Sequence, residues 1–104
     1  MTIKAARGGG IEVVMAELKT AVKISMAQAG ELDAQLKALL ETGEDTITVN
    51  MEDTSYISSV GLRALASAQK KANQTGKELL FTGVRPQILE IFEVTGFAGV
   101  FTIL

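Results

Sequence analysis

Short apolar segments with the pattern of strands recur along the chain. In TITVNM, Ile47, Val49 and Met51 alternate with polar residues, which is the two-residue period of a strand with a buried face. Clusters of β-branched and aromatic residues bounded by turn residues favour strands elsewhere. The predicted strands cover residues 2–7, 11–18, 46–50, 77–83 and 100–104, with an additional strand near 22–24.

The first helical pattern follows these early strands. Four leucines between residues 32 and 40 form a stripe at helical spacing, and Gly43 is typical of the residue that ends a helix. Gly30 interrupts the segment, so the helix is expected to begin either near Ser25 or near Glu31.

Two further helices are predicted nearer the C-terminus. From Val60 onward, apolar residues from 62 to 72 share one helical face, and Gly76 ends the pattern. A third helix is expected to start at Pro86, because proline suits the first turn of a helix, and to stop at Gly96.

The predicted order is β-β-α-β-α-β-α-β, and strands that alternate with helices imply right-handed crossovers and a largely parallel sheet. Gly8, Gly9 and Gly10 separate the first two strands and are interpreted as a hairpin turn; the GK[ST] ending of a phosphate loop is absent. We therefore predict one α/β domain over residues 1–104, with a small mixed, mostly parallel sheet and three to four α-helices.

Composition narrows the chemistry. The chain has 104 residues, 47% hydrophobic and 21% charged, which suits one globular domain. It has no His and no Cys, which excludes histidine-based nucleophiles and bases, thiolate catalysis and the usual zinc and iron–sulfur sites. We expect no cofactor, no metal and no catalytic residue.

Charge and hydropathy bear on location and partners. The net charge of −2 argues against nucleic-acid binding, which needs a basic face. No stretch has the roughly 20 apolar residues of a membrane span, and the N-terminus lacks the apolar run of a signal peptide. We therefore expect a cytoplasmic protein without a membrane span.

The loop EDTSYISSV, which joins a predicted strand to a helix, is the candidate site. It should lie at the carboxyl edge of the sheet, where ligands and partners of open α/β sheets bind. Ser58 and Ser59 stand just before the helix, and Gly61 allows another chain to come close to the backbone.

Two interpretations of Ser59 are compatible. It could be the N-cap, with its oxygen accepting a hydrogen bond from the amide of Leu62 or a neighbour. It could also accept a phosphoryl group, because a helix N-terminus carries partial positive charge and free amides that favour an anion. The phosphate would change any surface docked there.

The run from Val49 to Gly96 resembles the STAS domain, specifically the free-standing bacterial anti-sigma factor antagonists. The family's phosphorylation motif reads approximately D-x-S-x-(hydrophobic or Asp)-S-S/T-x-G-L, and the chain has DTSYISSVGL at 53–62. A second match combines GVRP at 83–86, an apolar helix and VTGF at 94–97. With the order of strands, the resemblance covers nearly the whole chain.

The resemblance implies that Ser59 is the phosphoacceptor, two positions before the motif glycine, with Ser58 the lesser candidate. Ser58 stands where other members have Asp. The family also has a Gly-Glu/Arg-Leu-Asp motif before its first helix. The letters GELD at 30–33 come too close to Asp53 for that role, so Asp33 is assigned none.

The function implied by the resemblance is a switch between partners. The unmodified protein would dock on an ATP-binding anti-sigma factor serine kinase and release a sigma factor. Phosphorylation would weaken the complex, and a PP2C-type phosphatase would restore it. The expected contacts around Ser59 are Ser58, Val60, Leu62 and Arg63, although Arg63 could equally be a solvated helix residue. Asp53 is expected to end the strand and cap the loop rather than bind a metal.

Several alternatives remain open at this point. A STAS module of another assembly, such as a stressosome or lipid-transport component, would share the fold and differ in partner. A receiver-like phosphotransfer domain is disfavoured, because IEVVMAELK has no adjacent acidic pair. An enzyme with a nucleophilic Ser58 or Ser59 would need Lys23 or Lys77 brought close by the fold, and the serines are not in a nucleophile elbow. The chain is therefore not expected to be an enzyme.

Overall fold

The computed structural model describes the backbone of residues 2–8 and 11–104 and the side chains from Glu17 onward. The predicted hairpin turn at Gly9 and Gly10 lies outside the described residues. The elements in chain order are β1 (Thr2–Gly8), β2 (Ile11–Lys19), β3 (Lys23–Ile24), α1 (Met26–Leu40), β4 (Thr46–Asn50), β5 (Tyr56–Ile57), α2 (Ser59–Thr75), β6 (Glu78–Thr82), α3 (Pro86–Val94), the 3₁₀ helix η1 (Phe97–Gly99) and β7 (Thr102–Ile103).

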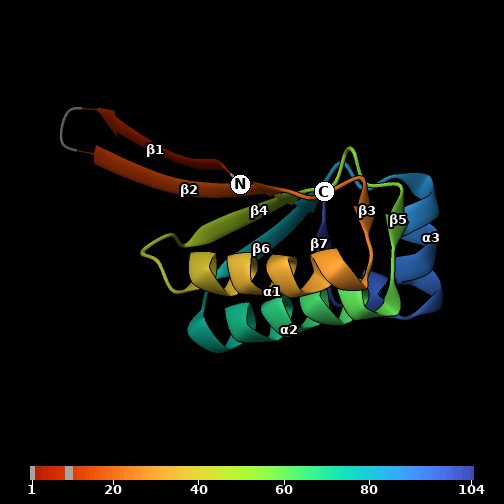
Figure 1. The fold of residues 1–104 in the computed structure, drawn as a ribbon. Helices are drawn as coiled ribbons and strands as arrows, with labels where there is room; N and C mark the ends of the chain where they lie inside the picture. The colour runs from red at the N-terminus through yellow and green to blue at the C-terminus, as the bar shows by residue number, and fades with distance from the viewer. Residues whose placement is uncertain (1, 9–10) are drawn as a thin grey trace.

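The main sheet has five strands in the order β1-β2-β4-β6-β7. The β1–β2 pair is antiparallel and the other pairs are parallel, which confirms the mixed, mostly parallel sheet. Helices α1 and α2 run parallel to each other along one face of the sheet (Figure 1). β3 and β5 form a separate two-stranded parallel ladder. This ladder lies at the end of the molecule where both helices begin (Figure 1).

Helix α1 begins at Met26, which settles the open question of its start. Ser25 is the N-cap, and its backbone N–H donates to the Gln28 side-chain oxygen at 3.2 Å. This bond, from the backbone of the N-cap to the side chain three residues later, belongs to a capping box and stabilises the start of the helix. Gly30 lies inside the helix rather than at its boundary.

The expected C-cap at Gly43 is wrong. The helix ends at Leu40, and the capping residue Glu41 has ordinary right-handed backbone angles (φ −91°). The Thr42 hydroxyl donates to the backbone oxygen of Leu39 at 2.6 Å. The backbone N–H groups of Glu41 and Thr42 also bond to the oxygens of Ala38 and Leu39, each at 3.2 Å. The last turn thus satisfies its carbonyls without a left-handed glycine.

The predicted end of α2 and the predicted start of α3 are both confirmed. Gly76 caps α2 with a left-handed φ of 70°, a conformation that glycine adopts without steric cost. Pro86 occupies the first turn of α3. Gly96, with φ 84°, follows the C-cap Thr95 and turns the chain into η1.

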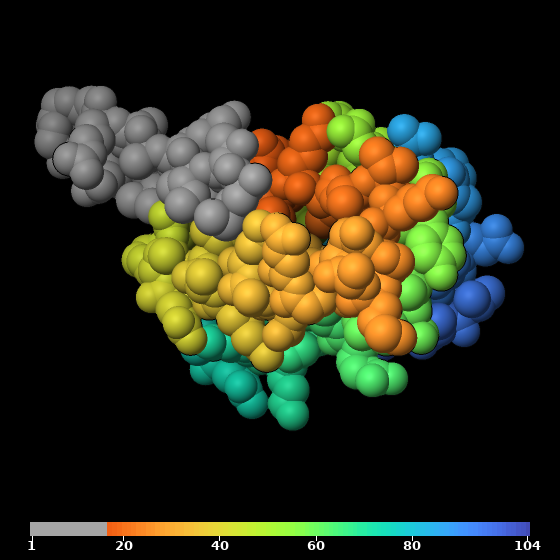
Figure 2. Space-filling view, viewed as in Figure 1, coloured from red at the N-terminus to blue at the C-terminus, as the bar shows by residue number. Residues whose placement is uncertain are grey.

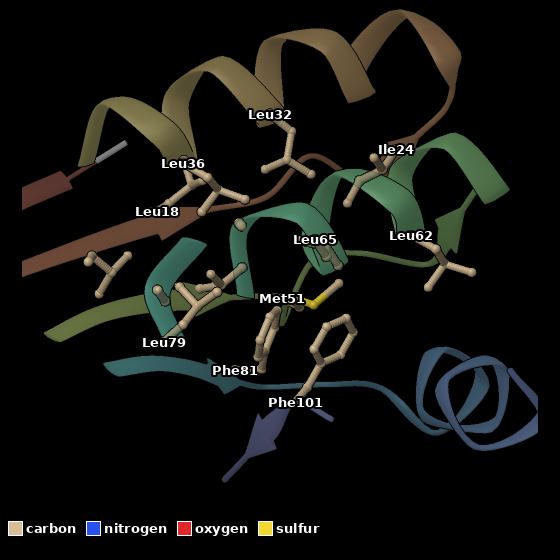
Figure 3. Close-up of a cluster of buried hydrophobic side chains, with 14 of the residues drawn as sticks. Leu18, Ile24, Leu32, Leu36, Met51, Leu62, Leu65, Leu79, Phe81 and Phe101 are labelled. Atoms are coloured by element: carbon tan, nitrogen blue, oxygen red, sulfur yellow. The ribbon is translucent and has the colours of Figure 1, made fainter. Parts of the chain in front are cut away.

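The core lies between the sheet and the helices (Figure 3). Leu18, Val49 and Phe81 are aligned across β2, β4 and β6, and all are at most 2% exposed. At the far side, the Phe101 ring stacks on Phe81 with centroids 4.6 Å apart. The leucines of α1 and the apolar face of α2 pack on this layer, together with Ile88 and Phe92 of α3.

Within the described part of the chain, no helix combines the length and apolar character that crossing a membrane requires.

Candidate functional site

The candidate site is the start of α2, where the loop after β4 passes through β5 into the helix. Ser58 is the N-cap, with extended backbone angles (φ −80°, ψ 167°), and its Oγ accepts a hydrogen bond from the Gly61 N–H at 3.1 Å. The expectation that Ser59 caps the helix is therefore wrong. Ser59 is the first residue of the helix, and the Leu62 N–H bonds to the backbone oxygen of Ser58 instead.

The two neighbouring hydroxyls therefore have different roles. The Ser58 side chain is half-buried and occupied by the cap, whereas Ser59 is exposed. As the first amides of the helix, the N–H groups of Ser59 and Val60 have no acceptor within it. The Ser59 hydroxyl thus stands in solvent at the positive end of the α2 dipole.

The β3–β5 ladder fixes the direction in which α2 leaves the loop. The N–H groups of Ser55 and Ser58 donate to the backbone oxygens of Val22 and Ile24, each at 2.8 Å. Gly61 then passes so close that a Cβ there would lie 2.7 Å from Ile24 Cγ2 and 2.8 Å from Ile57 Cγ1. Gly61 therefore serves close packing inside the protein rather than the approach of another chain.

Two buried threonines hold the loop to the end of β2. Thr54 is fully buried, and its hydroxyl donates to the Ala21 backbone oxygen at 2.7 Å. It also contacts the hydroxyl of Thr20, itself 5% exposed, at 2.5 Å. Because both buried hydroxyls are hydrogen-bonded, neither is left as an unpaired polar group, and their bonds fix the conformation of the loop.

Asp53 does not have the capping role that the sequence suggested. The Asn50 side chain caps the turn instead, since its oxygen accepts from the Glu52 N–H at 3.0 Å. Asp53 and Glu52 both pair with the Lys19 ammonium, at 3.2 and 3.0 Å. Hydrogen bonds from this ammonium to Glu52 and then Asp53 raise the pKa of Lys19 above its ordinary value.

The residues predicted to contact a partner differ in their exposure to solvent. Arg63 is exposed and Val60 is half-buried. Leu62 is only 6% exposed and belongs to the hydrophobic core (Figure 3). The expectation that Leu62 contacts a partner is therefore corrected, because its side chain faces inward from the buried side of α2.

Three exposed apolar residues near Ser59 were missed by sequence reasoning. Val22, Met26 and Tyr56 are 56%, 73% and 49% exposed. They surround the β3–β5 ladder, and the segments that carry them form one end of the molecule in Figure 2. Exposed apolar groups that gather in one place mark interaction surfaces. The only hint in the sequence is a tyrosine within an otherwise polar loop.

Comparison with known proteins agrees with this geometry. The family model described as "Mlab, STAS domain" matches residues 9–104. The anti-sigma-B factor antagonist of Staphylococcus aureus is 35% identical over 80 residues, which cover 77% of this chain and 74% of that protein.

Solved structures show the same fold. SpoIIAA, an anti-sigma factor antagonist, superposes in its unphosphorylated form with a TM-score of 0.74 at 12% identity, covering 99% of this chain and 88% of that one. The phosphorylated form of SpoIIAA from Bacillus superposes with a TM-score of 0.62 at 12% identity, covering 99% and 91%. From the family match and the sequence identity together, the chain belongs to the STAS domain family, among the anti-sigma factor antagonists.

Proposed function

We propose that this chain is a protein-binding module switched by phosphorylation of Ser59. In its unphosphorylated form it binds an ATP-binding anti-sigma factor serine kinase, and the sigma factor held by that kinase is released. Residues 1–104 act as one STAS domain in this proposal. The chain works in the cytoplasm, as a regulator rather than an enzyme, and without direct contact to nucleic acid.

The observation that supports this proposal best is the exposed Ser59 hydroxyl beside a Ser58 that already caps the helix. The kinase supplies Mg-ATP and a base. A bond forms between Ser59 Oγ and the γ-phosphorus, the bond to the β-phosphate oxygen breaks, ADP leaves, and the hydroxyl proton passes to the base. Ser58 is the lesser acceptor, because its Oγ is tied to the Gly61 amide.

The partner surface in this proposal consists of Ser58, Ser59, Val60 and Arg63, extended by the exposed Met26 and Tyr56. A phosphate adds a charge of about −1.5 to −2 at its centre. The helix N-terminus tolerates that charge, but a docked apolar or acidic surface does not. A PP2C-type phosphatase, by hydrolysing the phosphoester, restores the binding form.

The first prediction concerns the site of modification. Incubation with the purified anti-sigma factor kinase of the same organism and Mg-ATP should add one phosphate, detected by intact mass and located by fragmentation. Ser59→Ala should abolish the labelling, since it removes the attacking oxygen. Ser55→Ala, which removes a neighbouring exposed hydroxyl, is the matched control and should be labelled like the wild type.

Two outcomes would contradict the proposal in different ways. Unchanged labelling of Ser59→Ala would move the switch to another residue. A wild type that the kinase neither binds nor labels would instead favour a STAS module of another assembly, such as a stressosome or lipid-transport component.

A further inference from the structure

A groove of about 310 Å³ lies between α1 and α2. Its lining is mainly apolar and small, and one charged residue from each helix stands at its rim. It starts at Val60, the residue after Ser59, and is therefore continuous with the proposed partner surface. The residues used below are Ala29, Gly30, Asp33, Val60, Arg63 and Ala64.

The helical repeat explains how the groove is built. On α1, Met26, Gly30 and Asp33 are spaced i, i+4 and i+7, so they lie along one face of the helix. On α2, Val60 and Ala64 have the same i, i+4 spacing. The two helices run side by side in the same direction (Figure 1), so these faces border one channel. At Gly30, a Cβ would have no heavy atom within 4 Å.

The two rim charges are not equivalent. Asp33 pairs with Lys37 in its own helix, at 3.2 Å. Arg63 is exposed and makes no ion pair with any residue that the structure describes. An occupant of the groove therefore meets an apolar floor, the Arg63 guanidinium on the α2 side and, on the α1 side, the Asp33 carboxylate that is paired with Lys37. The matching chemistry is an apolar side chain with a carboxylate beside it.

We infer that this groove receives an amphipathic helix of the kinase, with an apolar side chain seated against Gly30 and Val60 and a carboxylate facing Arg63. The inference rests on the proposed function, because Val60 and Arg63 are shared between the groove and the surface around Ser59. Met26, which is 73% exposed, precedes Gly30 by four residues on the same helix and so adds an exposed apolar side chain to the same face of α1. Helices commonly bind in grooves of this kind through such spaced apolar anchors.

Arg63 then links the groove to the switch. It lies one helical turn after Ser59, at i+4, where side chains on a helix meet. A phosphate on Ser59 attracts the guanidinium by charge-assisted hydrogen bonds. The carboxylate of the bound helix thereby loses its cation and faces a like charge, so the phosphate weakens binding within the groove as well as at the serine itself.

The test is to fill the groove without disturbing the fold. In Gly30→Leu, the new side chain enters the groove, and loss of a glycine from a helix interior should raise the melting temperature by a few degrees. Binding of the unphosphorylated protein to the kinase, purified by its Ser59-labelling activity, should weaken at least about tenfold in Kd. Ala38→Leu, on an exposed part of α1 outside the groove, should bind like the wild type.

A second variant tests the charge. Arg63→Glu should weaken kinase binding about tenfold or more with an unchanged melting temperature, because it opposes the partner's carboxylate. Arg63→Lys should retain most of the affinity.

The outcomes separate this inference from the function on which it rests. If the wild type is labelled at Ser59 and Gly30→Leu binds the kinase with wild-type Kd, the groove is not the helix site and the switch stands. If sedimentation shows that Gly30→Leu abolishes self-association rather than kinase binding, the occupant is a second copy and the inference is overturned. If the wild type is neither bound nor labelled by the kinase, the proposed function fails and this inference is overturned with it.

Discussion

Ser58 and Ser59 are adjacent and chemically identical, yet the fold gives them different tasks. The sequence indicated a cap and an acceptor within this pair, and the cap fell on the other serine. What decides is the extended backbone at Ser58, which its hydrogen bond to Ile24 across the β3–β5 ladder supports. No local pattern contains that contact, because Ile24 is 34 residues away. The sequence placed Leu62 on the apolar face of the helix, while the resemblance placed it among the partner contacts; its burial agrees with the first of these.

This division of labour predicts the effect of removing each hydroxyl. Ser58→Ala should lower the free energy of unfolding by about 1 kcal/mol, because the Gly61 amide loses its acceptor. Ser59→Ala should leave stability nearly unchanged, and Ser58→Asp should retain the cap. Urea denaturation followed by circular dichroism measures all three. Equal losses for the two alanine variants would mean that the cap is not specific to Ser58.

At the scale of the elements, the longer ones were predicted from their periodicity. The helices over 59–75 and 86–94 and the strands β1, β2, β4 and β6 have patterns that extend over enough residues to be seen. The two-residue strands β3 and β7 were also anticipated, within the predicted strands near 22–24 and at 100–104. The two-residue β5 and the 3₁₀ helix η1 were missed, since neither has a period. Gly43 misled because the backbone amides of Glu41 and Thr42, together with the Thr42 hydroxyl, close the last turn of α1 before the glycine is reached.

The close packing of α2 on the β3–β5 ladder predicts a penalty at Gly61. Gly61→Ala should destabilise the protein by about 1–3 kcal/mol, because the new methyl group overlaps Ile24 and Ile57. Gly30→Ala is the matched control, a helical glycine with open space around it, and should be slightly stabilising. Thermal or urea unfolding gives both values. A Gly61→Ala protein as stable as the wild type would show that the ladder moves freely against the helix.

For the whole molecule, the alternation of strands and helices sufficed to predict the layered α/β arrangement. The strand predicted near 22–24 is confirmed as β3 (Lys23–Ile24), but its pairing with Tyr56–Ile57 could not be predicted, because the two short segments carry no pairing signal of their own. The exposed apolar residues of the partner surface were missed for the same reason. Exposure depends on which neighbours cover a side chain, and those neighbours come from distant parts of the chain.

The C-terminal segment pairs with β6 through β7 and also contacts this layered core through aromatic rings. Phe101 is 5% exposed and packs on Phe81, Phe92 and Phe97, with ring centroids 4.6–5.3 Å apart. Phe101→Ala should cost about 3–5 kcal/mol, a large part of the total for a domain of this size. The midpoint of urea unfolding should fall while its steepness stays the same. A shift below about 1 kcal/mol would mean that β7 and η1 are held by other contacts.

The ladder between β3 and β5 also determines when the switch can exist during synthesis. Ser55 bonds to Val22, 33 residues earlier, so the two strands can meet only after the segment between them has been synthesised and the chain has closed this loop. A chain still emerging from the ribosome carries Ser59 without the cap, the seated glycine and the oriented helix beside it. A Ser59 hydroxyl in its native position therefore indicates that the chain has been synthesised and folded at least through the start of α2. A kinase that recognises this position would not phosphorylate unfinished or unfolded copies.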